Sequence, residues 1–124
     1  MQKSEADFAI IGGGIVGLSV AHGLLKQGAS VICVDGTDTD FKASRGNFGL
    51  VWVQGKGIKT PFYAAWTRDA ARLYPSFVSE LSEETGIKIN LSQIGGYEYF
   101  IDSNSLDERI AEYKKLKSAL NGDY

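Results

Sequence analysis

The sequence predicts an α/β fold built on a parallel strand–helix–strand unit, and three features of residues 7–35 indicate it. A short apolar run at residues 8–11 (FAII) ends in three consecutive glycines. A segment with apolar residues at helical spacing follows, and a second β-branched run then closes at Asp35. Because parallel neighbouring strands need a crossover connection, which is usually a helix, the two strands are predicted to be parallel.

The bounds of these elements follow from the same residues. The first strand is predicted at residues 7–11, buried on both faces, because its apolar residues are continuous rather than alternating. The helix is predicted from Ile15 to Gln27, with Gly28 as the glycine that follows a helix end. The second strand is predicted at residues 30–34.

The next segments predict an extended run and a long helix. Residues 36–42 are polar and typical of a turn, and residues 48–53 (FGLVWV) are apolar and predicted to be extended. Thr60 followed by Pro61 predicts a helix start, and apolar positions repeat every three or four residues from there to Gly86. Pro75 predicts a kink or a break near Tyr74.

The last segments predict two paired strands and a final helix. Residues 87–91 alternate between apolar and polar, and a second extended run follows Gly95 and Gly96 as far as residue 101. Ser105 and Glu108 have the spacing of a capping box. The apolar stripe of the final helix consists of Leu106, Ile110, Tyr113 and Leu120.

Composition limits the class of protein and its partners. The 124 residues are 44% apolar and 23% charged, as expected for one globular domain or part of one. A net charge of −2 gives no basic surface for nucleic acid, which is excluded as a partner. The single cysteine, Cys33, indicates a reducing, cytoplasmic setting. The first apolar segment is neither a signal peptide nor a membrane span, while a peripheral membrane contact stays open.

The glycines after the first strand match a nucleotide-binding motif. Gly12-Gly13-Gly14-Ile15-Val16-Gly17 satisfies G-x-G-x-x-G between a predicted strand and a predicted helix. In this motif Gly12 permits the tight turn, Gly14 lets backbone approach a pyrophosphate, and Gly17 lets the helix pack closely on the sheet. The amides of Ile15 and Val16 at the helix start would face the phosphates.

Asp35 completes the motif, because a carboxylate there accepts hydrogen bonds from an adenosine ribose. It also repels a 2′-phosphate, which disfavours NADP. The motif alone leaves FAD and NAD both open, since the two share the ADP half that it recognises.

The segment Ala43-Ser44-Arg45-Gly46-Asn47-Phe48-Gly49-Leu50 resembles the second flavin-contacting loop of the D-amino-acid oxidase-like family, which includes glycine and sarcosine oxidases and related dehydrogenases. The resemblance implies FAD as the cofactor, with Ser44 and Arg45 near the pyrophosphate and Gly49 and Leu50 along the flavin ring. Asp35 departs from the pattern, because glutamate is commoner there in flavin enzymes. This departure leaves NAD as an alternative.

The resemblance implies an incomplete Rossmann-like FAD/NAD(P)-binding fold over residues 1–86 and the start of an α+β substrate domain over residues 87–124. Family members are longer, and their remaining part supplies most of the substrate sheet and a loop that closes over the flavin. The implied function is oxidation of a small-molecule amine or amino acid by hydride transfer to flavin. A complementing chain or self-association is expected, and the chain alone is expected to be inactive. A non-catalytic nucleotide-binding subunit remains an alternative.

The sequence assigns no catalytic side chain. His22 is the only histidine and lies among helical residues, so we predict no metal site. Oxidation by a flavin needs no acid–base pair of its own, because the cofactor carries the redox step.

Overall fold

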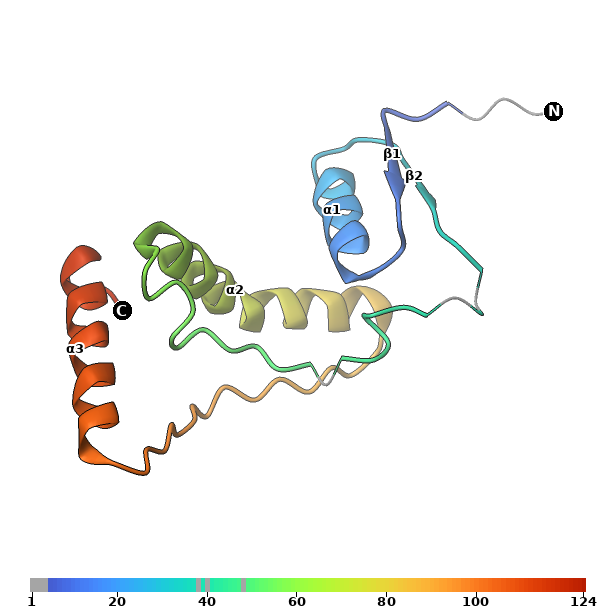
Figure 1. The fold of residues 1–124 in the computed structure, drawn as a ribbon. Coiled ribbons are helices and arrows are strands. Elements are labelled where there is room, and N and C mark those ends of the chain that lie inside the picture. The colour runs from blue at the N-terminus through green and yellow to red at the C-terminus, as the bar shows by residue number, and fades with distance from the viewer. Residues whose placement is uncertain (1–4, 38, 40, 48) are drawn as a thin grey trace. The chain divides into compact units, whose positions relative to one another are not determined.

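The computed structural model describes residues 5–37, 39, 41–47 and 49–124. These residues form two compact units, Met1–Leu50 and Val51–Tyr124, and each is described by itself (Figure 1). The domain boundary predicted after residue 86 concerns the organisation of a longer protein and stays a prediction.

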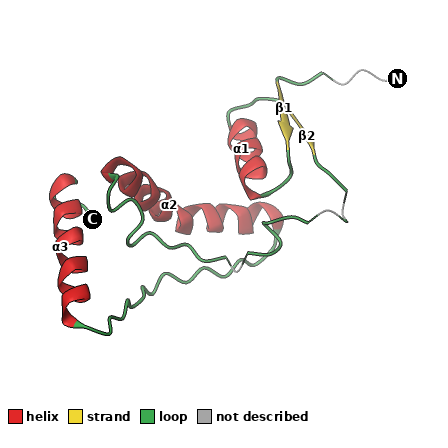
Figure 2. Ribbon diagram, in the orientation of Figure 1, coloured by secondary structure: helices red, strands yellow, loops and turns green. Residues whose placement is uncertain are grey.

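The first unit is the predicted strand–helix–strand unit. Strand β1 (Phe8–Ile11), helix α1 (Ile15–Lys26) and strand β2 (Val31–Val34) follow one another in the chain. The strands pair in parallel with Phe8 opposite Val31 and Ile11 opposite Val34. Helix α1 packs against both strands (Figure 2). The parallel prediction is confirmed, and each element differs from its predicted bounds by one residue.

Asp7 and Ser30 join the starts of the two strands. The Asp7 amide donates to Ser30 Oγ at 3.0 Å, and the Ser30 amide and hydroxyl donate to Asp7 Oδ2 at 2.8 and 2.7 Å. The Ser30 donors lower the pKa of Asp7. These bonds fix the register of the strand pair at its amino end.

The predicted burial of the first strand on both faces is wrong for this chain. Phe8 is 47% exposed and Ile11 is 92% exposed. The reason is that the described sheet has only two strands and α1 packs on it from one side. Apolar side chains that a larger α/β sheet would bury therefore remain in contact with solvent.

The second unit contains two helices, α2 (Pro61–Thr85) and α3 (Ser103–Ala119). Helix α2 starts at the predicted Thr60–Pro61 pair and ends at Gly86, whose φ of 69° suits a glycine. Pro75 lies inside α2 without breaking it. Figure 1 shows the predicted kink as a change of direction between the green first half and the yellow second half of α2.

Two predictions for this unit are wrong. The paired strands predicted within residues 87–101 do not form, since no further sheet is present among the described residues and an isolated hairpin is marginal in water. Residues 49–53 were predicted to be extended and belong to no helix or strand. Phe48, which opened the predicted extended run, lies outside the described residues. The N-cap of α3 is Asp102 rather than Ser105, because the Asp102 carboxylate accepts from the Ser105 amide at 2.8 Å.

Among the described residues, the buried apolar side chains belong to three alanines and one leucine. Ala21 is buried in the first unit, and Ala64, Ala71 and Leu116 are buried in the second. Leu116 lies three residues after Tyr113 and shares its helix face, although the predicted stripe omitted it. In the described part of the chain, none of the helices has the length and apolar character needed to cross a bilayer.

Candidate functional site

The glycine turn connects β1 to α1 as predicted. The Gly12 amide donates to the Val34 carbonyl at 2.7 Å, which continues the strand pairing into the turn. Gly12 has a φ of 104°, a left-handed conformation that favours glycine. Gly14 is the N-cap of α1. Because glycine has no side chain, residue 14 provides no acceptor for the first amides of the helix.

Gly17 sits where the helix crosses the turn. A Cβ at this position would lie 1.9 Å from the Gly12 carbonyl oxygen and 3.2 Å from Ile10 Cγ2. No side chain fits there without moving the backbone. The role that the motif gives this glycine, close packing of helix and strand, is visible in these distances.

Ser44 approaches the start of α1 from a later part of the chain. Its Oγ accepts the Ile15 amide at 2.9 Å. A Cβ on Gly14 would lie 3.3 Å from the same Oγ. The two segments that were predicted to hold one cofactor, the glycine turn and the 43–50 segment, therefore meet at the helix N-terminus.

Asp35 follows β2 and lies against the turn. A Cβ on Gly13 would be 2.9 Å from Asp35 Oδ2, so a side chain at this position would have to displace the Asp35 carboxylate. Lys42 Nζ donates to the same carboxylate oxygen. The Lys42 ammonium, followed by the amides of Gly13 and Gly36, lowers the pKa of Asp35 to about 2. At neutral pH Asp35 is a carboxylate that can only accept hydrogen bonds.

The other predicted site residues belong to the same two segments. Val16 is 75% exposed in the first turn of α1, and Leu50 is 59% exposed. Arg45 is exposed, and its amide donates to the Lys42 carbonyl at 2.9 Å. Gly49 has a φ of 72°, and its amide donates to Asn47 Oδ1 at 2.6 Å.

Lys42 was not among the predicted site residues. Its spacing after Asp35 carries no periodic signal, since none of the described residues between them belongs to a helix or strand. In the sequence, the one feature that could have pointed to Lys42 is its place two residues before the Ser44-Arg45 pair.

The residues fit the ADP half of a dinucleotide. A Cβ at position 13, 14 or 17 would lie against Asp35, Ser44 or the Gly12 carbonyl oxygen, respectively. Glycines at these positions keep the backbone of the turn open to a pyrophosphate and let the helix pack closely on the strand. The α1 N-terminus offers amides and the positive end of a helix dipole to phosphate. Asp35 offers an ionised acceptor of the kind that binds ribose hydroxyls.

Comparisons with known proteins agree with a dinucleotide site. Residues 7–123 match the family described as FAD dependent oxidoreductase (DAO). The chain is 41% identical over 118 residues to a subunit of opine oxidase from Rhizobium meliloti, covering 95% of this chain and 32% of that protein. It is 28% identical over 116 residues to glycine oxidase of Bacillus licheniformis, covering 94% of this chain and 31% of that protein.

The corresponding opine oxidase subunit from Agrobacterium tumefaciens (strain Ach5) is 40% identical over 118 residues, which are 95% of this chain and 32% of that protein. No solved structure matches the chain significantly. The chain thus spans about a third of the length of the curated relatives that it matches. The cofactor of the matched family is FAD, which confirms the predicted cofactor over the NAD alternative. This chain belongs to the DAO family of FAD-dependent oxidoreductases.

Proposed function

We propose that this chain forms the adenosine-side part of the FAD site in an enzyme that oxidises an amine or an amino acid. The observation that carries the proposal is the meeting of three groups at one turn. These are the Ile15 amide at the α1 N-terminus, the Ser44 hydroxyl that it contacts, and the Asp35 carboxylate beside Gly13. All three belong to the compact unit Met1–Leu50.

Each group has a role in binding. The Val16 amide would donate to the pyrophosphate, and the Ile15 amide would do so by exchanging Ser44 Oγ for a phosphate oxygen, while Gly14 would let the phosphates approach the backbone. Ser44 would offer its hydroxyl to the same phosphates, and Arg45 its guanidinium. Asp35 would accept from the ribose. Gly49 and Leu50 would run along the flavin ring, as in the family that the segment resembles.

Bound FAD would supply the redox chemistry of the reaction, as acceptor of a hydride from the amine-bearing carbon of the substrate, and the residues above would hold its ADP half. The names of the relatives support an amine or amino-acid substrate, and make an opine and glycine the first compounds to assay. The same names favour an oxidase over a dehydrogenase.

We further propose that the chain works together with additional polypeptide. It spans 32% of the length of its opine oxidase relatives, and these are named as subunits. Large apolar residues on its two strands are exposed, including Ile11 and Val34. Further polypeptide packed on this sheet would bury them and close the flavin side of the site.

Calorimetric titration with ADP and with FAD tests the binding part of the proposal. Gly14→Val puts branched carbons beside Ser44 Oγ, and we expect it to weaken ADP binding by at least about tenfold, which corresponds to about 1.4 kcal/mol. Gly23→Val is the matched control, because a Cβ on Gly23 meets nothing within 4 Å. Equal ADP affinity of the folded wild-type and Gly14→Val proteins would contradict the site assignment.

A further inference from the structure

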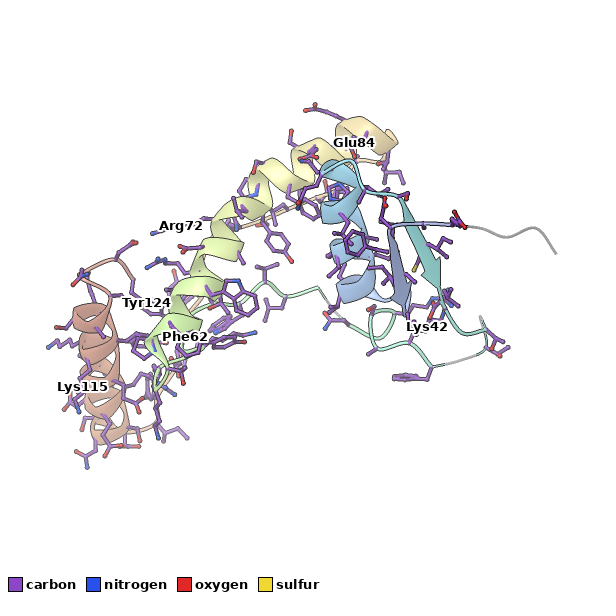
Figure 3. The ribbon with its side chains drawn as sticks, turned by 90° about the horizontal axis from the view of Figure 1, so that it is seen from above. Lys42, Phe62, Arg72, Glu84, Lys115 and Tyr124 are labelled. Carbon is purple, nitrogen blue, oxygen red and sulfur yellow. The ribbon has the colours of Figure 1, made fainter. Side chains whose placement is uncertain are left out.

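We infer that Lys42 is a positioning residue for recognition of the adenosine ribose, acting through the Asp35 carboxylate. The inference rests on the proposed function, since it takes the glycine turn as the nucleotide site. Figure 3 labels Lys42, whose ammonium donates to Asp35 Oδ2.

The ion pair between Lys42 and Asp35 is partly enclosed. The Lys42 side chain is only 16% exposed, against 35% for Asp35. A lysine on a polar loop normally keeps its ammonium in water, and holding four flexible bonds in one arrangement costs conformational entropy. Here the side chain is held against the carboxylate that faces the glycine turn.

Lys42 also shapes the neighbouring part of the site through its backbone. Its carbonyl accepts the Arg45 amide at 2.9 Å, and the Ala43 carbonyl accepts the Gly46 amide at 3.1 Å. This tight turn presents Ser44 to the Ile15 amide. Lys42 therefore contributes its side chain to the part of the site beside Asp35, where the ribose would bind, and its backbone to the turn that carries Ser44.

The Asp35 carboxylate keeps hydrogen-bonding capacity for a ligand. It has two oxygens with about four acceptor positions, and Lys42 together with the Gly13 and Gly36 amides uses part of that capacity. About one acceptor position remains, which can take one ribose hydroxyl. Without Lys42 the Asp35 side chain would lose a charge-assisted hydrogen bond and could rotate away from the turn.

The pair also changes the electrostatics expected from Asp35 alone. An isolated carboxylate repels a 2′-phosphate, but the Lys42 ammonium compensates this charge and is itself a good phosphate donor. The structure thus predicts weaker discrimination against a 2′-phosphate than Asp35 by itself would give.

Calorimetry with three nucleotides tests the inference: ADP, 2′-deoxy-ADP, and ADP carrying a 2′-phosphate. In Lys42→Met we expect ADP to bind about tenfold more weakly, while 2′-deoxy-ADP loses less because it makes fewer bonds to Asp35. The preference for ADP over its 2′-phosphorylated form should rise in the same variant. Two affinity ratios are compared, that of ADP to 2′-deoxy-ADP and that of ADP to its 2′-phosphorylated form, and Lys42→Arg should restore both toward wild type. Lys26→Met, in the last turn of α1, is the matched control.

The outcomes separate the two proposals. If wild type binds ADP and Lys42→Met leaves both affinity ratios unchanged, the inference is wrong and the proposed function stands. If Lys42→Met weakens all three nucleotides equally, Lys42 has only a structural role and the inference is also wrong. If the wild-type protein does not bind ADP, both the proposed function and the inference about Lys42 are wrong. A separate readout is the Asp35 carboxyl titration by NMR, whose pKa should move up toward 3.8 in Lys42→Met.

Discussion

The Gln93 side-chain amide donates to the Ala71 carbonyl of α2 at 3.0 Å. Ala71 is the residue whose carbonyl would normally accept the amide of residue 75, four positions later. That residue is Pro75, which has no amide hydrogen. The 86–102 segment thus supplies, through one side chain, the hydrogen bond that the proline removes from the helix.

We expect Gln93→Leu to destabilise the second unit by about 1 kcal/mol, because it leaves the Ala71 carbonyl without its donor. In a Pro75→Ala background the amide of residue 75 can serve this carbonyl, so the same substitution should cost close to nothing. Urea unfolding of the two single variants and the double variant measures the coupling between these positions. Gln27→Leu, at the exposed end of α1, is a control. Additive effects of the two substitutions would show that the Gln93 bond does not replace the missing helix bond.

The two glycines inside α1 should respond oppositely to alanine. Gly17→Ala places a Cβ 1.9 Å from the Gly12 carbonyl oxygen, and overpacking of this kind costs about 1–3 kcal/mol of stability. Gly23→Ala enters open space and should stabilise the helix by about 0.5–1 kcal/mol, as alanine does relative to glycine. Thermal and urea unfolding of both variants measures the change in stability that each substitution causes relative to wild type. A neutral Gly17→Ala protein with unchanged ADP affinity would mean that helix and turn are not as close as described.

Asp35 should make stability depend on pH in a narrow acid window. Its pKa is about 2 in the folded chain and 3.8 as the ordinary value, because the Lys42 ammonium and two backbone amides favour the charged form. A lowered folded pKa contributes stability that is fully present above pH 3.8 and is lost as the pH falls to 2. Asp35→Asn should therefore lose stability relative to wild type above this window, and the two proteins should converge below it. Unfolding measured from about pH 2 to about pH 6 tests this, and a constant difference across the window would refute it.

We expect the 124-residue chain with added FAD to oxidise amines no faster than free FAD. The sequence and the site assign no residue to hold a substrate over the flavin, and loss of such positioning forfeits about 7–11 kcal/mol of barrier reduction. Anaerobic bleaching of the flavin with glycine, sarcosine, proline, D-amino acids and an opine measures it. Bleaching well above the free-FAD control would show that the chain carries a complete active site.

The first unit could be predicted from the sequence because its signals are local. The glycines, the apolar runs and Gly28 each act on residues next to them, and the parallel pairing follows from the connecting helix. The meeting of Ser44 with the Ile15 amide is consistent with the placement that the family resemblance implied. Lys42 could not be predicted because none of the described residues between it and Asp35 belongs to a helix or strand that would give their spacing a meaning.

The second unit was harder to predict because its segments depend on partners distant in sequence. Alternation in residues 87–91 predicts a strand only where another strand can pair with it, and none does among the described residues. The helix bounds at Thr60 and Gly86 were predictable, since a proline start and a glycine end act through their own backbone. The Gln93 bond could not be foreseen, because it joins a helix to a segment without regular structure.

The Asp7–Ser30 bonds have a consequence for how the chain folds during synthesis. These residues are 23 positions apart, and Ile15 and Ser44 are 29 apart, so both contacts lie within the first 44 residues of the chain. N-terminal segments emerge first from the ribosome. The turn can therefore assemble as soon as residue 44 has emerged. A nascent chain could then bind its nucleotide before the segments after residue 50 have been synthesised.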